Sequence, residues 1–363
     1  MNTLKSLSES ELTQRTASVP GLRLTALEID DERWTRFVVA TSRAHPFHHP
    51  TWGRLLADCY GYRPFALVLL DGDGIAAGIP VIETRNLFGR RRWISLPFTD
   101  YLPPLARDER LVPLLVAELE AARQAQRVSE VEMRAAVGGL PVRQQPAGFL
   151  HVLRLGPDPA CVFRTFHRSQ VQQRIVKGER EGVLVRQATT KDDLTRTFYE
   201  LHLDTRHRLG VPIQPRRYFD FLWERIIAAG RGFVLLAYWK DMPIAGAVFL
   251  AWNGTVTYKY SASRQEFWKL RPNNMVIWNG IRWGCENGFH TFDFGRTEPG
   301  NEGLRSFKSA WGTAEQLLSY STLAGGPPTQ AITRGAQMLR WPIQTMPAWF
   351  CRLLGELAYK RAA

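Results

Sequence analysis

A polar loop at residues 269–274 leads into an expected helix that begins near Met275. The first turn of a helix has backbone N–H groups without partners and the positive end of the helix dipole, so it favours an anion such as phosphate. Asn273 or Asn274 suits the N-cap position, because its side-chain oxygen can accept from those N–H groups. Arg271 would add a charge-assisted contact. The pattern predicts a site for the phosphates of a donor, formed by Arg271, Asn273, Asn274 and Met275.

Two further pairs of side chains are candidates to bind an acceptor. Tyr258 and Tyr260 alternate along one expected strand and therefore share a face, from which they could line an acyl channel. Packing in the core is the alternative for aromatic strand residues. Arg174 and Lys177 lie one turn apart on an expected helix and could hold acceptor phosphates. A solvated helix face is the alternative for this second pair.

Several other chemistries are not expected, because their signatures are missing. The sequence has no nucleophile elbow, P-loop, dinucleotide-binding glycine motif or kinase signature, which argues against hydrolases, NTPases and dehydrogenases. The four cysteines lie far apart without paired spacing, which argues against a zinc site and a disulfide scaffold. His48 and His49 are adjacent, and adjacent side chains rarely converge on one ion. No bound metal is expected.

The net charge of +13 indicates polyanionic partners. Nucleic acid, nucleotide phosphates and an anionic membrane face all fit, and a basic surface that serves only solubility is the alternative. No apolar run reaches the roughly 18 residues of a membrane-spanning helix. The polar N-terminus lacks the apolar core of a signal peptide. A cytoplasmic protein is expected.

Helix and strand signals occur twice in the same order, at an offset of about 160 to 170 residues. The first set is a helix at 52–60, strands at 65–70, 75–82 and 93–96, a helix at 111–127 and a strand at 131–137. The second set is a helix at 218–229, strands at 233–238, 244–250 and 255–261, a helix at 275–287 and a strand at 289–295. This repetition predicts two similar α/β domains, at residues 1–155 and 156–325.

The segments outside the repeats are also expected to be helical. A basic helix is predicted at 159–181, ended by Gly182. Beyond a Gly-Gly-Pro-Pro linker at 325–328, residues 331–360 are basic and rich in Leu, Trp and Met, with two prolines. This composition suits a helical tail at 326–363 that lies on a membrane surface. Docking of the tail onto the protein itself is the equal alternative.

Several segments, taken in order, resemble the FemAB-like family and the related BioF2-like acetyltransferase domain of the GNAT superfamily. They are Leu-Arg-Pro-Asn-Asn at 270–274, Phe-Asp-Phe-Gly-Arg at 292–296, Gly-Leu-Arg-Ser-Phe-Lys at 303–308, Phe-Gly-Arg at 88–90 and Ser-Leu-Pro-Phe-Thr-Asp-Tyr at 95–101. The resemblance extends over about residues 40–322. The loop at 269–274 departs from the superfamily pattern, because it lacks the glycine-rich phosphate signature.

The resemblance implies an α/β (α+β) fold of two tandem GNAT-like domains, each a mixed twisted sheet flanked by helices. Known members transfer an amino acid from aminoacyl-tRNA to an amine of a peptidoglycan precursor, and related members belong to exopolysaccharide and lipid-modification pathways. It therefore implies acyl transfer to an amine or hydroxyl of a cell-envelope or exopolysaccharide precursor. Acyl-CoA or aminoacyl-tRNA would be the co-substrate, and no covalently bound cofactor is expected.

Acyl transfer needs positioning, a base, and a cation or N–H donors at the developing oxyanion. Lys308, in a Phe-Lys pair shared with the family, is the candidate that stabilises the oxyanion or the donor; a surface lysine on a helix is the alternative. Asp293 follows an aromatic strand at the edge of the sheet where ligands collect, and is a candidate base or acceptor-binding group. A structural carboxylate bonded to the following loop is the equal alternative.

The resemblance also implies acceptor-side residues. Asp100 and Tyr101 occupy the related position in the first half, after a strand and a Pro-Phe loop, and are assigned to catalysis and acceptor binding, against a role in stabilising the turn. Arg296, in the matched segment 292–296, is a further candidate for acceptor binding.

Three functions stay open. The first is an acyl- or aminoacyltransferase acting on a small or lipid-linked envelope precursor, with tRNA as a candidate partner and peripheral contact with the inner face of the cell membrane through the tail. The second is a CoA-dependent N- or O-acetyltransferase of a sugar or polysaccharide intermediate. The third is a non-catalytic binding or scaffold protein of envelope biosynthesis.

Overall fold

The computed structural model describes residues 21–85, 89–139, 141–324 and 343–359 of the chain. The chain divides into two compact units. Unit 1 contains the described residues up to Pro146 together with residues 318–324, and unit 2 contains residues 147–317 together with the tail at 343–359. The predicted boundaries at 155 and 325 differ from this division. The linker at 325–328, the first part of the tail and Phe88 lie outside the described residues.

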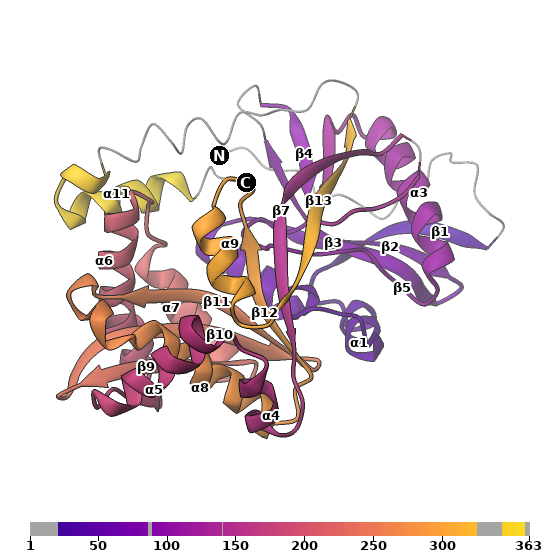
Figure 1. Cartoon of the computed structure of the whole chain (residues 1–363). Coiled ribbons are helices and arrows are strands. Elements are labelled where there is room, and N and C mark those ends of the chain that lie inside the picture. Colours follow the sequence, from indigo (N-terminus) through magenta and orange to yellow (C-terminus); the bar gives the residue numbers. More distant parts are fainter. Residues whose placement is uncertain (1–20, 86–88, 140, 325–342, 360–363) are drawn as a thin grey trace. The chain divides into compact units, whose positions relative to one another are not determined.

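Unit 1 is an α/β unit with helices on both faces of a mixed sheet (Figure 1). Its strands follow the order β1-β2-β3-β4-β6-β13, with β5 beside β3. The elements are β1 (Leu22–Glu28), α1 (Glu32–Ala40), η1 (Pro46–His48), α2 (Pro50–Tyr60), β2 (Pro64–Asp71), β3 (Gly74–Arg85), β4 (Arg91–Ile94), β5 (Leu105–Ala106), η2 (Glu109–Leu111), α3 (Val112–Ala125), β6 (Glu130–Met133), the start of β7 (Arg143–Arg154) and the end of β13 (Ala314–Ala324).

The strands of unit 1 are apolar because helices cover the sheet on both faces. β2 and β3 are buried along almost their whole length, as expected for strands covered on both faces. Leu115 and Leu119 of α3 share one core cluster with Leu67 of β2. On the opposite face Trp34 of α1 packs on Gly78, where a Cβ would lie 3.0 Å from the indole ring.

Unit 2 repeats this design with more helix. Its strands follow the order β7-β12-β11-β10-β9-β8. The elements are the end of β7, α4 (Pro159–Arg164), η3 (Arg168–Gln172), α5 (Gln173–Arg180), β8 (Leu184–Gln187), η4 (Asp193–Phe198), α6 (Tyr199–Leu209), α7 (Arg216–Leu222), η5 (Trp223–Ile227), β9 (Gly232–Trp239), β10 (Met242–Trp252), β11 (Thr255–Ser263), η6 (Gln265–Leu270), α8 (Pro272–Glu286), β12 (Thr291–Thr297), α9 (Glu302–Ser309), the start of β13 and α11 (Ala348–Ala358).

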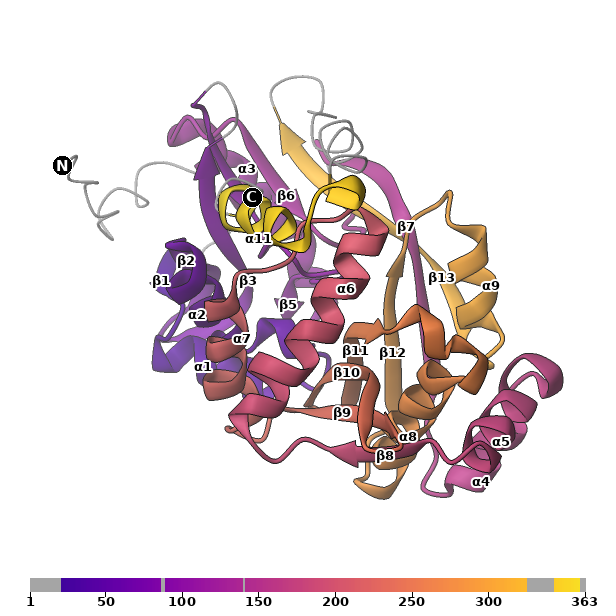
Figure 2. The same cartoon turned by 90° about the vertical axis from the view of Figure 1, so that its left-hand side faces the viewer.

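The helices α8 and α6 lie on the two sides of strands β9 to β11 (Figures 1 and 2). α8 approaches closely because it carries glycine at the contact: a Cβ on Gly280 would lie 2.7 Å from the ring of Phe249. On the other side Phe198, at the end of η4, packs on Gly246 of β10. The sheet of unit 2 is thus covered on both faces, and its edge at the ends of β11 and β12 is the part available for chemistry.

The predicted duplication is present in the topology. In unit 1 the hairpin β2-β3 is followed by β4, helix α3 and strand β6, and β6 pairs parallel to β4. In unit 2 the hairpin β9-β10 is followed by β11, helix α8 and strand β12, and β12 pairs parallel to β11. The fold is the expected one of two tandem GNAT-like α/β domains.

The last strand of each repeat is exchanged, which the sequence did not reveal. β7 follows β6 in the chain but pairs antiparallel to β12 in unit 2. β13 follows β12 but pairs antiparallel to β6 in unit 1. Each unit therefore contains a strand from the other repeat. This exchange is the reason that boundaries drawn along the chain at 155 and 325 do not delimit the compact units.

The basic helix predicted at 159–181 is interrupted. The chain leaves the helical path between α4 and η3, where the backbone N–H of His167 donates to the carbonyl of Ala310 at 2.8 Å. The imidazole of His167 then accepts from the N–H of Gln170 at 3.4 Å and opens the next helical segment. An N-cap inside the predicted helix ends one segment and starts another.

The described part of the tail forms α11, which packs against α6 in unit 2 (Figure 2). Arg217 pairs with Glu356 at 2.5 Å, and Arg206 donates to the hydroxyl of Tyr359 at 2.8 Å. Cys351 is fully buried. This is the docked arrangement of the two predicted alternatives. Within the described residues, no helix is long and apolar enough to cross a membrane.

Candidate functional site

The parallel strands β11 and β12 part after only three paired residues. Their register joins Thr255–Thr257 to Thr291–Asp293 and stops there. β12 continues beside β7, with an irregularity in the register between Asp293 and Arg296. The parting of two parallel strands opens the carboxyl edge of the sheet, where open α/β sheets bind ligands. Asp293 stands at the point of parting.

Asp293 and Lys308 converge on Gly295, just beyond that point. The Asp293 carboxylate accepts from the N–H of Gly295 at 2.7 Å. The Lys308 ammonium donates to the carbonyl of Gly295 at 2.8 Å and to that of Arg296 at 3.1 Å. Both side chains are buried, and Gly295 has φ +69°, which favours glycine. The pair therefore fixes a bulge in β12, and Lys308 is a buried lysine on α9 and not a surface one.

A buried histidine that the sequence did not single out lies in the same part of unit 2. His151 of β7 is fully buried, and its Nε2 lies 3.1 Å from Oε2 of Glu315. Its Nδ1 has no hydrogen-bond partner among the described residues. Burial lowers the pKa of His151, and the charge of Lys308 lowers it further, whereas Glu315 opposes the shift. The only sequence signal was a histidine inside an apolar strand.

Arg305 of α9 binds Glu315, the residue that contacts His151. Its guanidinium donates twice to the Glu315 carboxylate, at 2.6 Å each, and lies 3.9 Å from the ring centre of Phe149. This bond holds the pKa of Glu315 below its usual range. Arg305 and Lys308 both belong to α9, so the bidentate pair also fixes the helix that carries Lys308.

The start of α8 differs from the prediction. The helix begins at Pro272, and Arg271, with φ +60°, occupies the N-cap without a side-chain cap bond. Proline at the first helical position has a suitable φ and no N–H to satisfy, which moves Asn273 and Asn274 into the first turn. Neither asparagine is therefore the N-cap. Asn273 donates instead to the hydroxyl of Ser263 at 3.2 Å.

Two nitrogen donors at this helix start are buried without a partner among the described residues. They are Nε of Arg271 and Nδ2 of Asn274. Unpaired buried donors carry a free-energy penalty, of roughly 1–3 kcal/mol each, unless a ligand or water satisfies them. Met275 packs on Gly178 of α5, where a Cβ would lie 2.6 Å from the Met275 side chain. Arg174 and Lys177, both half-buried, lie on that same helix α5.

Tyr258 and Tyr260 do not share a face, contrary to the prediction. The pairing of β11 with β10 shifts between Val248 and Phe249, so that Lys259 is an extra residue. Such a bulge reverses the alternation of side chains. Tyr258 packs with the aromatic rings on the α8 side, and burial raises its pKa to about 12. Tyr260 lies on the α6 side, and its hydroxyl is 2.8 Å from that of Tyr218.

Arg296 is half-buried in unit 2. Its Nη1 donates to the carbonyl of Ala147 at 3.0 Å, and its Nη2 lies 3.6 Å from Glu298. The side chain is therefore held against the exchanged strand β7, while its backbone carbonyl accepts from Lys308.

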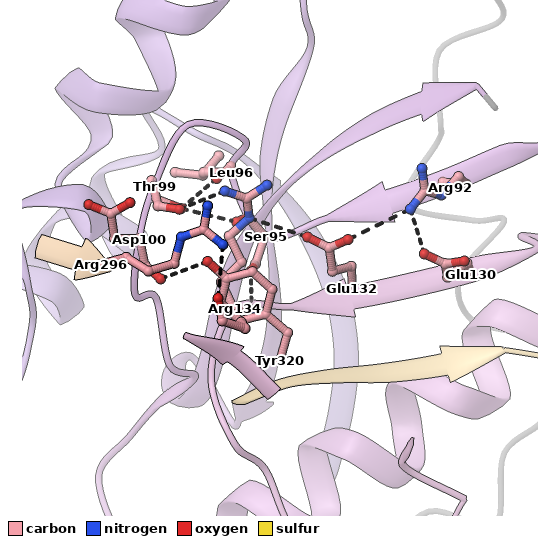
Figure 3. A network of polar contacts seen from close by, with 11 residues as sticks. Arg92, Ser95, Leu96, Thr99, Asp100, Glu130, Glu132, Arg134, Arg296 and Tyr320 are labelled. Atoms are coloured by element: carbon pink, nitrogen blue, oxygen red, sulfur yellow. Dashed lines mark hydrogen bonds and ion pairs between the residues drawn. The ribbon is translucent and has the colours of Figure 1, made fainter. Parts of the chain in front are cut away.

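Unit 1 has its own parting of parallel strands, between β4 and β6. The pairing ends at Ile94 and Glu132, and a loop at 95–101 follows β4. This loop contains Asp100 and Tyr101. Asp100 makes no side-chain hydrogen bond or ion pair with the described residues, whereas Tyr101 packs on the core of unit 1, and burial raises its pKa. Figure 3 shows the polar side chains around the loop.

The described residues contain no group of three or more His, Cys, Asp or Glu side chains suited to a metal ion.

Comparison with known proteins identifies the domain type. Residues 165–309 match the family described as "Acetyltransferase (GNAT) domain". This part of the chain is therefore similar to a GNAT acetyltransferase domain. The predicted resemblance to FemAB-like proteins is supported by the relatives and folds to which the chain is similar. Lipid II:glycine glycyltransferase of Staphylococcus aureus is 30% identical over 97 residues, which are 24% of this chain and 23% of that protein. The match thus spans about a quarter of the curated relative.

Solved structures share the fold over most of the chain. FemX has a TM-score of 0.66 at 13% identity, over 82% of this chain and 96% of FemX. L-PGS from Bacillus licheniformis has a TM-score of 0.54 at 15% identity, over 88% and 99% of the two chains. A tandem GNAT protein from the clavulanic acid biosynthesis pathway has a TM-score of 0.51 at 12% identity, over 85% and 100%. These similarities establish the tandem fold.

Proposed function

We propose that the protein is a FemAB-like acyltransferase that transfers an acyl or aminoacyl group to an amine or hydroxyl of a lipid-linked cell-envelope precursor. The observation that carries the proposal is the opening between β11 and β12 with the start of α8 beside β11. There Arg271 and Asn274 present two buried nitrogen donors without partners in the described chain. A donor phosphate would satisfy both and would gain from the helix dipole.

The proposed reaction is an addition and elimination at the donor carbonyl. The acceptor nitrogen or oxygen attacks the carbonyl carbon of an ester or thioester and forms the new C–N or C–O bond. The proton of the acceptor passes to a base, for which the Asp100 carboxylate is our candidate. Collapse of the tetrahedral oxyanion breaks the bond to the leaving group, which takes up a proton from the protonated base and departs as the tRNA hydroxyl or the CoA thiol. Stabilisation of that oxyanion is the largest single contribution that such a site can make.

Lys308 has two parts in this proposal. Its bonds to Gly295 and Arg296 hold the bulge of β12 at the parting of the strands. Its buried positive charge would favour the oxyanion or a donor phosphate, because a charge acts more strongly in a site that excludes water. Arg296, Tyr258, Arg174 and Lys177 remain proposed acceptor-side residues.

The donor is either acyl-CoA or aminoacyl-tRNA. The glycyltransferase and L-PGS similarities support aminoacyl transfer in an envelope or lipid pathway. The GNAT domain match supports acetyl-CoA equally well. Binding of tRNA should weaken steeply as salt rises, because each phosphate that the protein neutralises releases counterions. Acyl-CoA binding should depend on salt much less.

Peripheral contact with an envelope membrane is part of this proposal. α11 buries Cys351 and Gly355 against unit 2, and its other side exposes Trp349 and Leu353. Exposed Met346 lies beside α6, because His207 contacts its carbonyl at 2.6 Å. Tryptophan and leucine on a helix that also carries arginine are typical of an interfacial surface.

The test of the proposed function is transfer of label from radiolabelled acetyl-CoA and from aminoacyl-tRNA to an extract of lipid-linked envelope precursors by the purified protein. Labelled product with one donor supports the proposal and identifies that donor. Absence of product with both, from a folded protein that also binds neither donor, favours the scaffold function.

A further inference from the structure

The loop at 95–101 of unit 1 adopts a backbone that its own residues do not favour. Leu96 has φ +36° and Phe98 has φ +64°, although both are bulky non-glycine residues. Leu96 is fully buried. Such conformations persist only where the surroundings impose them, and they concentrate at functional sites. The loop is therefore held in place from outside.

Two side chains bind consecutive carbonyls of this loop (Figure 3). Arg134, just after β6, donates to the carbonyl of Thr99 at 2.6 Å. Tyr320 of β13 donates its hydroxyl proton to the carbonyl of Asp100 at 2.9 Å. The Arg134 guanidinium also lies 5.6 Å from the ring centre of Tyr320, so the two side chains support each other.

A chain of buried and half-buried charges fixes Arg134. Its Nε lies 3.3 Å from Glu132, which lies 3.7 Å from Arg92, which in turn pairs with Glu130 at 2.5 Å. The backbone N–H of Arg134 donates to the hydroxyl of Ser95 at 2.8 Å, at the beginning of the loop. Arg134 therefore ties both ends of the loop to β6.

The exchanged strand fixes Tyr320. Its neighbour Ser321 is fully buried, pairs with Met133 in the sheet and accepts from the N–H of Val137 at 2.8 Å. A strand with a buried polar bond in register cannot slip without losing that bond. Unit 1 thus depends on the second repeat for one of the two contacts that hold its loop.

These two bonds fix the backbone of Asp100, whereas its carboxylate is not used to hold the loop. The carboxylate is half-buried and has no hydrogen bond or ion pair with the described residues. A residue that served only the turn would use its carboxylate to bind loop N–H groups, as Asp293 does in unit 2. Here the turn is held by Arg134 and Tyr320 instead.

We propose that Arg134 and Tyr320 are positioning residues that hold Asp100 toward the acceptor, with Tyr320 supplied by the strand exchanged from the second repeat. This inference rests on the proposed function, in which Asp100 takes the acceptor proton. Holding a base within a fraction of an ångström of its productive place is worth one or more orders of magnitude in rate.

The variants that test it are Tyr320→Phe, which keeps the ring and removes the hydroxyl, and Arg134→Met, with Arg134→Lys as the conservative form. Thr322→Val, which changes a half-buried hydroxyl of the same strand, is the matched control. Two readouts are measured on the full-length protein: hydrogen–deuterium exchange of the peptide covering residues 96–102, and kcat and KM of acyl transfer with the donor that supports turnover.

We expect Tyr320→Phe and Arg134→Met to raise loop exchange about 10-fold and to lower kcat about 10-fold with KM changed less than about 2-fold. Arg134→Lys should recover part of both losses, and Asp100→Asn should abolish turnover with wild-type loop exchange. Unchanged loop exchange in both variants overturns the inference, and so does a mobile loop with wild-type kcat. If the wild type transfers no group from either donor, the proposed function fails, and the exchange data alone decide whether these two side chains hold the loop.

Discussion

Lys308 and Asp293 hold the same peptide from opposite directions: the lysine donates to the Gly295 carbonyl, and the aspartate accepts from the Gly295 N–H. These two bonds fix β12 at the place where it leaves β11. Lys308, which the family resemblance indicated, and Asp293, where β12 leaves β11, therefore stabilise the same bulge. The proposed catalytic role of Lys308 depends on this fixed geometry as well as on its charge.

Replacing Lys308 should impair both turnover and stability. In Lys308→Met the apolar stem is kept, but the buried carbonyl of Gly295 and the half-buried carbonyl of Arg296 lose their donor. This loss should cost roughly 1–3 kcal/mol of unfolding free energy. Loss of the cation should lower kcat by about 100-fold or more. Denaturant unfolding and steady-state kinetics measure the two effects. Lys240→Met, at an exposed lysine in the turn between β9 and β10, is the control. A folded Lys308→Met enzyme with full turnover would remove Lys308 from the catalytic site.

The exchanged strand predicts that a residue near the end of the chain stabilises unit 1. Leu323 of β13 is fully buried in the core cluster of α3 and β6. Leu323→Ala should cost about 2–5 kcal/mol, because it leaves a cavity in that core. Hydrogen exchange should rise in peptides of α3 and β6. Leu317→Ala, at an exposed position of the same strand, should leave exchange unchanged. Protection of α3 unaffected by Leu323→Ala would contradict the exchange of strands.

The buried His202 predicts that the folded protein loses stability as the pH falls. Burial lowers the pKa of His202 from 6.5 to about 3. Between these values the unfolded chain binds a proton that the folded chain does not. The free energy of unfolding should therefore fall as pH drops from 6.5 towards 3, by up to about 1.4 kcal/mol per pH unit.

Denaturant unfolding at pH 7.5, 6 and 5 measures this dependence. Burial lowers the pKa of His48 to about 3 as well, so His202→Gln should reduce the slope without abolishing it, and the variant loses some stability at pH 7.5. His290→Gln, at an exposed histidine, should keep the wild-type slope. Equal slopes in all three proteins would show that His202 is not the group responsible.

The exposed side of α11 predicts binding to anionic vesicles. Deleting the tail would also remove the buried contacts of Cys351 and the ion pair of Glu356, so point variants are the cleaner test. Trp349→Gln with Leu353→Gln should weaken sedimentation with phosphatidylglycerol vesicles about 10-fold or more while the melting temperature stays within a few degrees. The control Val176→Gln changes an exposed apolar residue of α5. Wild-type sedimentation of the double variant would reject a membrane role for α11.

Local signals in the sequence predicted most of the elements. Thr190 and Asp193, three residues apart as in a capping box, form the reciprocal bonds that this spacing predicts. The repeated order of helix, hairpin, strand, helix and strand gave the tandem fold, because each of its elements has a strong period of its own. The exchange of β7 and β13 was not predictable in this way. Which partner a strand chooses depends on contacts far apart in the sequence, and a local pattern contains no information on them.

The site was predictable in its residue types and less so in its geometry. The sequence indicated Lys308 and Asp293 as candidates. It did not show that both bond to Gly295, because that arrangement depends on the bulge in β12. The bulge at Lys259 likewise placed Tyr258 and Tyr260 on opposite faces, because one inserted residue reverses the alternation. His151 was missed because its partner, Glu315, lies far away in the sequence on β13, which neighbours β7 only in the folded sheet.

Donor binding at the start of α8 tests the central claim most directly. Isothermal titration of acetyl-CoA and of aminoacyl-tRNA, at low and high salt, should give binding of one donor by the wild type. Arg271→Met should weaken that binding about 10-fold or more, because the variant removes a charge-assisted contact to phosphate. Arg282→Met, an exposed arginine farther along the same helix, should bind as the wild type does. Equal affinity in all three proteins, or no affinity for either donor in a folded wild type, would contradict the assignment of this opening as the donor site.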